Sequence, residues 1–394
     1  MVFVDDEPLV LSGLANVLRR YRQVWEMCFV GSAEEALALF GTGTVDVIVS
    51  DLRMNKVDGM TLLRQVQQRY PDVVRVVLSG TPELVASVKA SLVAHQFLVK
   101  PCPADALIQV LERAVGLRSV LKNNLVRQVV GGTAGLPSLP RVYLELNQAL
   151  SDPGVSVPKL VRIVEQDAAM CAKLLQLVNS GFFGLGRRIG NIKDALAYLG
   201  THVLRDVLLG ISVFDVFRGR LTVPGFSMER EQARAYLAAR IARRITSKER
   251  ANDAYTAAML QDLGRLILAV HLPNEVAVMR SAASRTGRPQ SEVEQESWGF
   301  GHPAVASYLL GLWGLPLAIV EAVAHHHSPQ RAARQEFDLV ATTHVSGVLA
   351  EEQLPDERLA PAKLDAKYIT AIGGAAHVAG WRSVAAEEAL RIEA

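Results

Sequence analysis

Cysteine and net charge are both scarce in this sequence. Three cysteines occur in 394 residues, Cys28, Cys102 and Cys171, and their spacing fits neither a disulfide framework nor a metal-binding motif. With 42 basic and 40 acidic residues the net charge is only +2, so composition gives no argument for binding nucleic acid or an anionic membrane. The N-terminal residues lead directly into a predicted strand, without a signal peptide. These absences predict a cytoplasmic protein with reduced thiols.

Long apolar runs are also missing, with one stretch that needs a closer look. From Pro303 to Val320 there is no charged residue, over about the length of a membrane span. Gly311, Gly314 and Pro316 interrupt this stretch, Ser307 is polar, and no Lys or Arg flanks it closely. We therefore expect a buried helix–turn–helix and no membrane segment.

The first 118 residues alternate short apolar runs with amphipathic stretches. The predicted buried strands are Val2–Val4, Met27–Val30, Val45–Ser50, Val74–Ser79 and Phe97–Val99. The predicted helices are Leu9–Tyr21, Ala33–Phe40, Met60–Arg69, Leu84–Val93 and Asp105–Arg118. This alternation predicts an α/β domain with a five-stranded, doubly wound parallel sheet, which would bind ligands at the carboxyl ends of its strands.

Helical patterns dominate the rest of the chain. The last helix of the first domain is predicted to continue towards Val130, before glycines 131, 132 and 135 interrupt it. The following all-α domain has predicted helices at Val142–Leu150, Val157–Gln166, Met170–Asn179, Asn191–Leu199, Thr201–Phe217, Glu229–Lys248, Asp253–Val270, Val305–Leu312 and Leu317–His325. We therefore divide the chain into a domain at 1–118, a linker at 119–135, a helical domain at 136–346 and a helical extension at 347–394.

Polar side chains stand where four of the predicted strands end. Asp5 and Asp6 follow the first strand, Asp51 follows the third, Ser79 ends the fourth and Lys100 follows the fifth. Carboxylates gathered at one sheet edge repel each other unless a cation lies between them, and Mg²⁺ is the first candidate because it prefers oxygen ligands. Any one of these residues could merely end a strand at a solvated turn. Together they form a phosphoryl-transfer site in which Asp51 is the nucleophile.

Residues 2–118 resemble a response-regulator receiver domain. The matching segments are Val-Phe-Val-Asp-Asp-Glu-Pro at 2–8, Asp-Leu-Arg-Met at 51–54 with Asp58–Gly59, Leu-Ser-Gly at 78–80 and Phe-Leu-Val-Lys-Pro at 97–101. The resemblance implies that a sensor histidine kinase phosphorylates Asp51 and that Mg²⁺ is held by Asp5, Asp6, Asp51 and the main-chain carbonyl of Arg53. It also implies that Ser79 and Lys100 bind the phosphoryl group and that Phe97 turns inward on activation. Asn55 stands where the family often has proline.

Residues from 136 to about 345 resemble the HDOD family, the degenerate relatives of HD-type metal phosphohydrolases. The resemblance rests on Leu-Pro-Ser-Leu-Pro at 136–140, Lys-Leu-Leu-Gln-Leu-Val-Asn-Ser at 173–180, Met-Leu-Gln-Asp-Leu-Gly-Arg-Leu at 259–266, Gly-His at 301–302, Trp-Gly-Leu-Pro at 313–316 and His-His-Ser-Pro at 326–329. It implies an all-helical output domain that engages a protein partner.

The His-Asp pair of active HD enzymes is missing, because Gln261 precedes Asp262. An amide is a poor ligand for a transition metal compared with an imidazole. The resemblance also places two further ligand positions near Arg230 and Ser346. The degenerate site would keep Asp262, His302, His326 and His327, and neighbouring histidines on one helix point about 100° apart and do not chelate together. We therefore expect no enzymatic activity in this domain, and metal binding by the remaining residues stays open.

Two other functional classes stay open. The first is a metal-dependent phosphodiesterase of cyclic dinucleotides, against which Gln261 argues. The second is a nucleic-acid-binding regulator, for which the only feature is a basic stretch whose ordinary interpretation is a solvated helix face: Arg240, Arg243, Arg244, Lys248 and Arg250. The sequence also leaves undecided whether the protein forms a homodimer. The kinase, the downstream protein partner and the direction of the response are not encoded in any recognisable motif.

Overall fold

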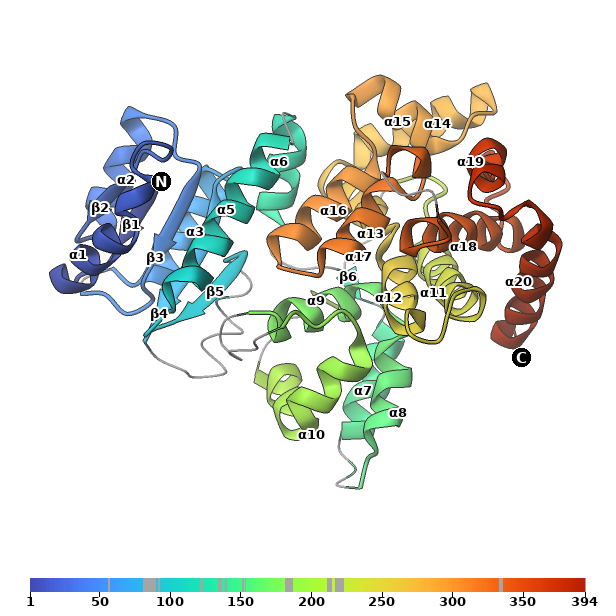
Figure 1. The fold of residues 1–394 in the computed structure, drawn as a ribbon, viewed down its shortest axis with the longest axis horizontal. Coiled ribbons are helices and arrows are strands. Elements are labelled where there is room, and N and C mark those ends of the chain that lie inside the picture. Colours follow the sequence, from blue (N-terminus) through green and yellow to red (C-terminus); the bar gives the residue numbers. More distant parts are fainter. Residues whose placement is uncertain are drawn as a thin grey trace.

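Two domains lie next to each other in the computed structural model, an α/β domain at the N-terminus and a helical domain after it (Figure 1). The structure describes residues 1–55, 57–80, 90, 93–120, 123–133, 137–138, 140–150, 152, 154–180, 187–210, 215–216, 223–332 and 336–393.

The α/β domain contains the predicted parallel sheet. Its strands are β1 (Val2–Val4), β2 (Cys28–Val30), β3 (Val47–Ser50), β4 (Val74–Ser79) and β5 (Gln96–Val99). They run in the order β2-β1-β3-β4-β5, and every neighbouring pair is parallel. This order confirms the predicted fold and brings the carboxyl ends of β1 and β3 side by side. At the edge of the sheet, β5 faces the helical domain.

Helices cover both faces of the sheet, because successive strand residues point to opposite sides. The described helices of this domain are α1 (Pro8–Val17), the 3-10 turn η1 (Arg19–Tyr21), α2 (Ala33–Thr42), α3 (Gly59–Arg69) and α5 (Ala104–Val120). Phe3 and Val76 pack on the side of α5, whereas Val4 and Val77 pack on the side of α3. Most of the predicted helix Leu84–Val93 lies outside the described residues.

The rest of the chain is helical, as predicted. Its helices are α6 (Asn124–Gly132), α7 (Pro140–Leu150), α8 (Val157–Val164), α9 (Ala168–Val178), α10 (Ile192–Gly210), α11 (Met228–Ile245), α12 (Ala251–Leu260), α13 (Leu263–His271), α14 (Pro273–Thr286), α15 (Gln290–Trp298), α16 (His302–Leu312), α17 (Leu317–His325), α18 (Leu339–Gln353), α19 (Ala366–Ala371) and α20 (Val378–Glu393), with 3-10 turns η3 (Pro329–Arg331) and η4 (Ala375–His377). The uncharged stretch forms α16 and α17 with a turn between them, as predicted. Within the described part of the chain, none of the helices has the length and hydropathy needed to span a bilayer.

Three local predictions were wrong. Asp215 and Val216 were predicted to end a helix, but they form β7 and pair with Pro137 and Ser138 of β6, a contact between segments far apart in sequence. The predicted single helix Asp253–Val270 is interrupted at Gln261 and Asp262, where α12 ends and α13 begins. Local periodicity reports neither the long-range strand pairing nor the break between α12 and α13.

The third wrong prediction concerns the linker, which is not a continuation of α5. Helix α5 ends at Val120, and α6 begins anew with Asn123 as its N-cap, accepting a hydrogen bond from the main-chain N–H of Leu125. The Asn123 amide also donates to the Trp298 carbonyl of the helical domain, 3.0 Å away. The linker therefore contains a separate helix that is tied to the second domain.

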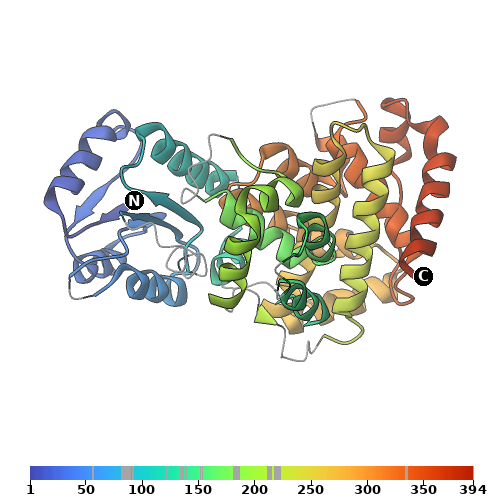
Figure 2. The same ribbon diagram turned by 90° about the horizontal axis from the view of Figure 1, so that it is seen from below.

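Apolar residues of both domains join in one core. Figure 2 shows α5 and α6 on the side of the α/β domain that meets the helical domain. Leu111 of α5, Val126 of α6 and Leu309 of α16 belong to the same buried cluster. At the edge strand, the Gln96 amide of β5 donates to the Leu312 carbonyl of α16 over 2.6 Å. The two domains are thus packed against each other along α5, α6 and β5.

Candidate functional site

Three carboxylates and one ammonium meet at the carboxyl edge of the sheet. Asp5 and Asp51 follow β1 and β3 and are 2% and 6% exposed. Lys100 follows β5, and its Nζ lies 2.5 Å from Asp5 Oδ2 and 2.8 Å from Asp51 Oδ2. Burial acts to lower the pKa of Lys100, but its hydrogen bonds to Asp5 and Asp51 outweigh burial and raise that pKa. Lys100 is therefore a firmly held cation between the two buried carboxylates.

The main chain holds Asp51 from its other side. The N–H of Leu52 donates to Asp51 Oδ1 over 2.6 Å, and that of Arg53 donates to the same oxygen over 3.4 Å. Gly59 packs so closely behind Asp51 that a Cβ there would overlap the Asp51 carbonyl. Glycine is the residue that permits this approach. The carboxylate is thus fixed at both oxygens, one by amides and one by Lys100.

Asp6 is oriented by the residue that departs from the family pattern. The main-chain N–H of Asn55 donates to Asp6 Oδ2 over 2.9 Å, and its side-chain amide donates to the same oxygen over 2.7 Å. Both bonds are made to Oδ2, so one of the two oxygens of the Asp6 carboxylate is held by Asn55. Asn55, in the loop after β3, therefore fixes the side chain of Asp6, a predicted metal ligand.

The donor set at this edge fits Mg²⁺. Asp5, Asp6 and Asp51 supply hard carboxylate oxygens, and with Lys100 they leave a net charge of −2 that one such ion would neutralise. Ser79, at the end of β4, and Phe97, within β5, are both buried beside this edge. The structure therefore brings together the side chains that the sequence placed at strand ends. The main-chain carbonyl of Arg53 as a ligand stays a prediction.

A second cluster of possible metal ligands lies in the helical domain. Asp262, His302, His326 and His327 each offer a ligand atom, and these atoms all lie within 4.8 Å of one another. His302 Nε2 is 3.2 Å from Asp262 Oδ1 and 3.1 Å from His327 Nε2. The premise that His326 and His327 lie on one helix was wrong, and their ligand atoms come close together. Helix α17 ends at His325, so the two imidazoles follow the bend that leaves the helix.

The guanidinium of Arg265 lies within this cluster. Its Nε is 2.9 Å from Asp262 Oδ1 and 3.4 Å from His302 Nε2. Its Nη2 pairs with Glu351 Oε1 at 2.9 Å, and its Nη1 is 3.7 Å from Glu231 Oε2. The side chain is 6% exposed, so this charge is held almost entirely by protein carboxylates. Arg265 was not among the predicted site residues, although it stands in the quoted motif at 259–266.

Electrostatics divide the histidines of the cluster into two kinds. Burial acts to lower the pKa of His302, but the Glu294 carboxylate, 2.7 Å from His302 Nδ1, outweighs it and raises that pKa. Burial lowers the pKa of His326 to about 3 and also lowers that of His327. Burial would raise the pKa of Asp262, but the charge of Arg265 outweighs it and holds that pKa well below its ordinary value. Asp262 is therefore ionised, and His326 and His327 are neutral.

The three residues predicted to stand in place of lost metal ligands lie outside this cluster. Gln261 is buried with its amide against Gly347 of α18, and its Oε1 finds no hydrogen-bond partner among the described residues. Arg230 is 39% exposed and pairs with Asp356, so it does not oppose a metal directly. Ser346 donates to the Thr343 carbonyl of its own helix. The cation that faces the cluster is Arg265 and not Arg230.

Comparisons with known proteins agree with this division of the chain. Residues 1–112 match the response regulator receiver domain family, and residues 136–329 match the HDOD domain family. The chain joins a response-regulator receiver domain to an HDOD domain. The receiver and HDOD resemblances of the sequence are therefore confirmed.

Curated relatives match one part of the chain or the other. An uncharacterized protein of Treponema pallidum (strain Nichols) is 23% identical over 207 residues, which are 52% of this chain and 40% of that protein. The hydrogenase transcriptional regulatory protein HoxA of Cupriavidus necator is 33% identical over 118 residues, 29% of this chain and 24% of that protein. The regulator NtrC of Salmonella typhimurium is 35% identical over 126 residues, 30% of this chain and 27% of that protein. The chain thus spans two fifths or less of the length of these relatives.

Two solved structures share the fold. The MmoQ response regulator of Methylococcus capsulatus str. Bath is 21% identical with a TM-score of 0.50, covering 63% of this chain and 98% of that one. A virulence factor of Campylobacter jejuni is 20% identical with a TM-score of 0.50, covering 60% of this chain and 83% of that one.

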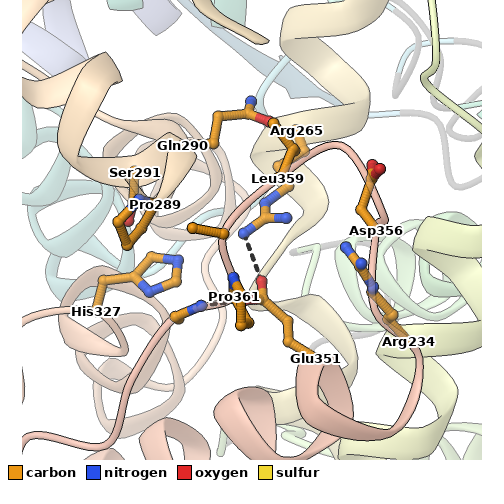
Figure 3. A pocket seen from close by; sticks show the side chains of 12 residues that line it. Arg234, Arg265, Pro289, Gln290, Ser291, His327, Glu351, Asp356, Leu359 and Pro361 are labelled. Atoms are coloured by element: carbon orange, nitrogen blue, oxygen red, sulfur yellow. Dashed lines mark hydrogen bonds and ion pairs between the residues drawn. The ribbon is translucent and has the colours of Figure 1, made fainter. Parts of the chain in front are cut away.

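The space beside Arg265 in the HDOD domain is small. Figure 3 shows Arg265, Glu351 and His327 around a pocket that the loop carrying Leu359 and Pro361 covers. Its cavity of about 20 Å³ is room for one water molecule. Two bonds hold the loop in place: the N–H of Ala362 donates to Glu351 Oε2 over 2.8 Å, and Asp356 pairs with Arg280 at 2.7 Å. A nucleotide does not fit this closed pocket.

A much larger cavity, of about 1020 Å³, opens where the two domains meet. Gly116 and Leu117 of receiver helix α5 line one side, and residues of α15, α16 and α17 line the other. Its charged lining is mixed, because Arg288 pairs with both Glu292 and Glu296. His327 belongs to the walls of both this cavity and the small pocket.

Proposed function

We propose that this protein is a cytoplasmic two-component response regulator whose Asp51 accepts a phosphoryl group from a sensor histidine kinase and controls a non-catalytic HDOD domain. The observation that carries the proposal is the convergence of Asp5, Asp6, Asp51 and Lys100 at one sheet edge. A carboxylate nucleophile, metal-binding oxygens and a neutralising ammonium are the parts that phosphoryl transfer needs. Similarity of the first domain to NtrC-type receivers supports the assignment.

The geometry indicates how Asp51 would react. One oxygen of Asp51 forms the new bond to phosphorus while the bond between phosphorus and the donor breaks, and the leaving group keeps that electron pair. Lys100, now bonded to Asp51 and Asp5, is close enough to pair with the transferred phosphoryl oxygens. Mg²⁺ held by Asp5, Asp6 and Asp51 would neutralise charge on those oxygens. The amides of Leu52 and Arg53 keep the carboxylate aligned.

Contacts between the domains supply a route for the signal. Lys100 directly follows β5, the strand whose Gln96 is bonded to the Leu312 carbonyl of α16. A movement of Lys100 towards a phosphoryl group on Asp51 would therefore pull on an element that contacts the HDOD domain. Helix α5 packs on α16 from the same side. We propose that phosphorylation shifts this packing and changes how the HDOD domain engages a protein partner.

An enzymatic role for the HDOD domain is disfavoured by its site. Water activation needs a metal held by fixed ligands with one position open. Here Gln261 replaces a histidine, Arg265 pairs with Asp262, and the adjoining pocket has room for about one water molecule. This small pocket, lined by Arg265 and His327, is too small for a nucleotide.

Nucleic-acid binding is disfavoured by the partners of the basic stretch. Arg240 pairs with Glu388, Arg243 with Glu165, and Arg244 with Glu387 and Glu388. These contacts join α11 to α20 and to the end of α8. Because carboxylates of the protein already neutralise these arginines, they do not form a free basic surface for phosphates.

Phosphorylation of Asp51 is tested with a small acyl phosphate donor and Mg²⁺. The full-length protein should become labelled, and the label should survive acid but not base, as an acyl phosphate does. Asp51→Asn should abolish labelling because an amide is not a nucleophile, whereas Asp105→Asn, an exposed carboxylate on α5, should be labelled like wild type. Equal labelling of the Asp51→Asn protein would contradict the proposal.

Absence of catalysis is tested on the same full-length protein. We expect no hydrolysis of cyclic dinucleotides or simple phosphodiesters with Mg²⁺, Mn²⁺ or Zn²⁺, phosphorylated or not. Turnover that disappears in Asp262→Ala would show that the HDOD site is an active phosphodiesterase.

A further inference from the structure

The four convergent groups of the HDOD domain have the spacing of a zinc site. Zn²⁺ binds imidazole nitrogen and carboxylate oxygen at about 2.0–2.2 Å, so tetrahedral ligand atoms lie roughly 3.3 Å apart. The observed separations are 3.2 Å between His302 Nε2 and Asp262 Oδ1, 3.1 Å between His302 Nε2 and His327 Nε2, and 3.9 Å between His326 Nε2 and Asp262 Oδ1. These distances would need only small adjustments to enclose an ion.

The outer contacts of two histidines also suit metal binding. His302 Nδ1 faces the Glu294 carboxylate at 2.7 Å, and His326 Nδ1 faces the Val323 carbonyl at 2.8 Å. Each contact leaves Nε2 directed into the cluster, which is the arrangement that holds a metal-ligating imidazole in the correct orientation. His326 Nε2 and Asp262 Oδ1 are buried and without a hydrogen-bond partner of good geometry among the described residues. The imidazole nitrogens and the carboxylate oxygen of the cluster therefore point toward a place that a cation could occupy.

A protein cation already lies at this place. Arg265 Nε is 2.9 Å from Asp262 Oδ1 and 3.4 Å from His302 Nε2, the two atoms that a metal would bridge. Its Nη2 is held at 2.9 Å by Glu351, whose other oxygen is bonded to Ala362 in the covering loop. A guanidinium and a divalent ion cannot share the same carboxylate oxygen at these distances, because their charges repel at close range.

We propose that Arg265 is the resident cation of the HDOD domain, occupying a latent three-histidine, one-aspartate metal site and excluding divalent ions from it. The inference rests on the proposal that this domain is not catalytic, and it supplies a physical reason for that loss. The guanidinium neutralises Asp262 and joins α13, α18 and the covering loop, which a metal ion would do in an enzyme. The HDOD domain would then keep its helix arrangement without depending on metal supply.

The control for this proposal is available in the same pocket. Arg234 of α11 is as buried as Arg265, pairs with Glu231 and donates to the Leu354 carbonyl, but has no contact with Asp262. Arg265→Met and Arg234→Met each remove one buried guanidinium of similar size from this region. Only the first frees the Asp262 oxygen.

The experiment titrates the full-length protein with Co²⁺, whose visible absorption reports histidine ligands, and measures bound Zn²⁺ after dialysis. We expect no stoichiometric metal in wild type or Arg234→Met, and about one equivalent in Arg265→Met, bound at least tenfold more tightly than in wild type. Addition of His326→Ala to Arg265→Met should remove the Co²⁺ absorption. Arg265→Met should also unfold at a lower temperature without metal, and Zn²⁺ should restore part of the loss, because the buried carboxylates regain a cation.

Two outcomes would overturn the inference. One is a wild-type protein that binds an equivalent of Co²⁺ through His326. The other is an Arg265→Met protein that is folded and binds no metal. If Arg265→Met is unfolded even with Zn²⁺, Arg265→Lys decides: the shorter cation should keep the fold and still exclude metal, and metal binding by this variant would contradict the proposal. Metal bound by the wild-type protein without turnover would refute the inference and leave the proposed signalling function intact.

Discussion

Single residues at the acidic edge of the sheet are positioned by their neighbours as well as by their own strands. Asp6 shows this most clearly, because both hydrogen bonds to its Oδ2 come from Asn55, a residue nearly fifty positions away. These bonds fix the orientation of the Asp6 carboxylate. Lys100 similarly joins Asp5 and Asp51, which follow different strands.

Removal of the Asp6 carboxylate should weaken Mg²⁺ binding. Asp6→Ala deletes one charged oxygen ligand, so we expect at least about a tenfold loss of affinity, on the order of 1.4 kcal/mol. Calorimetric titration of the full-length protein measures it. Glu7→Ala, which removes the exposed acid next in the chain, should bind Mg²⁺ as wild type does. Unchanged affinity in Asp6→Ala would count against the acidic edge as the metal site.

Lys173 is a buried residue whose charge should make stability depend on pH. It is 1% exposed, its Nζ lies 5.1 Å from the centre of the Trp313 ring, and burial lowers its pKa from 10.5 to about 7. Between pH 10 and pH 7 the unfolded chain therefore binds a proton that the folded protein does not. Stability should fall as the pH is lowered through this window and level off below pH 7.

Thermal unfolding at pH 7.5 and pH 9.0 measures this dependence. A single group of this kind changes the free energy of unfolding by at most about 1.4 kcal/mol per pH unit. The contribution of Lys173 should make the wild-type protein more stable at pH 9.0 than at pH 7.5. Lys173→Met keeps the buried methylenes without the charge and should lose this part of the pH dependence. Lys159→Met, at an exposed position of α8, should keep it. An identical pH profile in Lys173→Met would show that the lysine is not the source.

At the scale of elements, α6 is held between the two domains. The buried Arg75 of β4 donates from Nη2 to the Gly131 carbonyl near the end of α6 over 2.7 Å. Gly131 also lies so close to Pro71 that a Cβ there would overlap the Pro71 carbonyl. On its other side α6 packs on α13 and α16. A helix inside the linker therefore fixes how the receiver meets the HDOD domain.

The close approach of α6 is tested by adding one methyl group. Gly131→Ala should lower stability by about 1–3 kcal/mol, because the backbone behind it must shift to relieve the overlap. Gly132→Ala is the matched control, since a Cβ there meets nothing within 4 Å and alanine favours the helix. Differential scanning calorimetry compares the two. A stable Gly131→Ala protein would mean that α6 does not dock as described.

The whole molecule depends on a core that crosses the domain boundary. Leu117 of α5 packs against Gly311 of α16, and a Cβ at Gly311 would lie 2.9 Å from Leu117 Cδ1. The Gln96 bond to Leu312 is next to this contact. The receiver is therefore docked through its last helix and its edge strand, the elements nearest to Lys100.

A larger side chain at Gly311 should separate the domains while leaving each folded. We expect Gly311→Leu to increase the radius of gyration in X-ray scattering with little change in helix content. Gly380→Leu, at an exposed position of α20 where a Cβ meets nothing within 4 Å, should scatter like wild type. An unchanged radius of gyration in Gly311→Leu, with the helix content of wild type, would show that the contact does not hold the domains together.

Much of the receiver site could be predicted from the sequence because its determinants are local. Apolar runs of three to six residues predict parallel strands, and parallel strands bring their ends to one edge. Asp5, Asp51, Ser79 and Lys100 therefore had to lie close together once the strands were recognised. The same holds for Gln261, since a motif position shows directly which ligand type is missing.

Tertiary contacts decided the rest. The convergence of His326 with His302 and the place of Arg265 depend on where α17 ends and how α13 packs on α16, and hydrophobic periodicity reports neither. Gly264 illustrates the reason: a Cβ there would overlap the His302 carbonyl, so the two helices approach closely at one point between residues 38 positions apart. The sequence by itself determined the two domain types and the acidic edge of the sheet, because these follow from patterns within single segments. Only the folded chain decided which cation faces Asp262 and how the receiver meets the HDOD domain, because side chains from distant helices must first be brought within a few ångströms of each other.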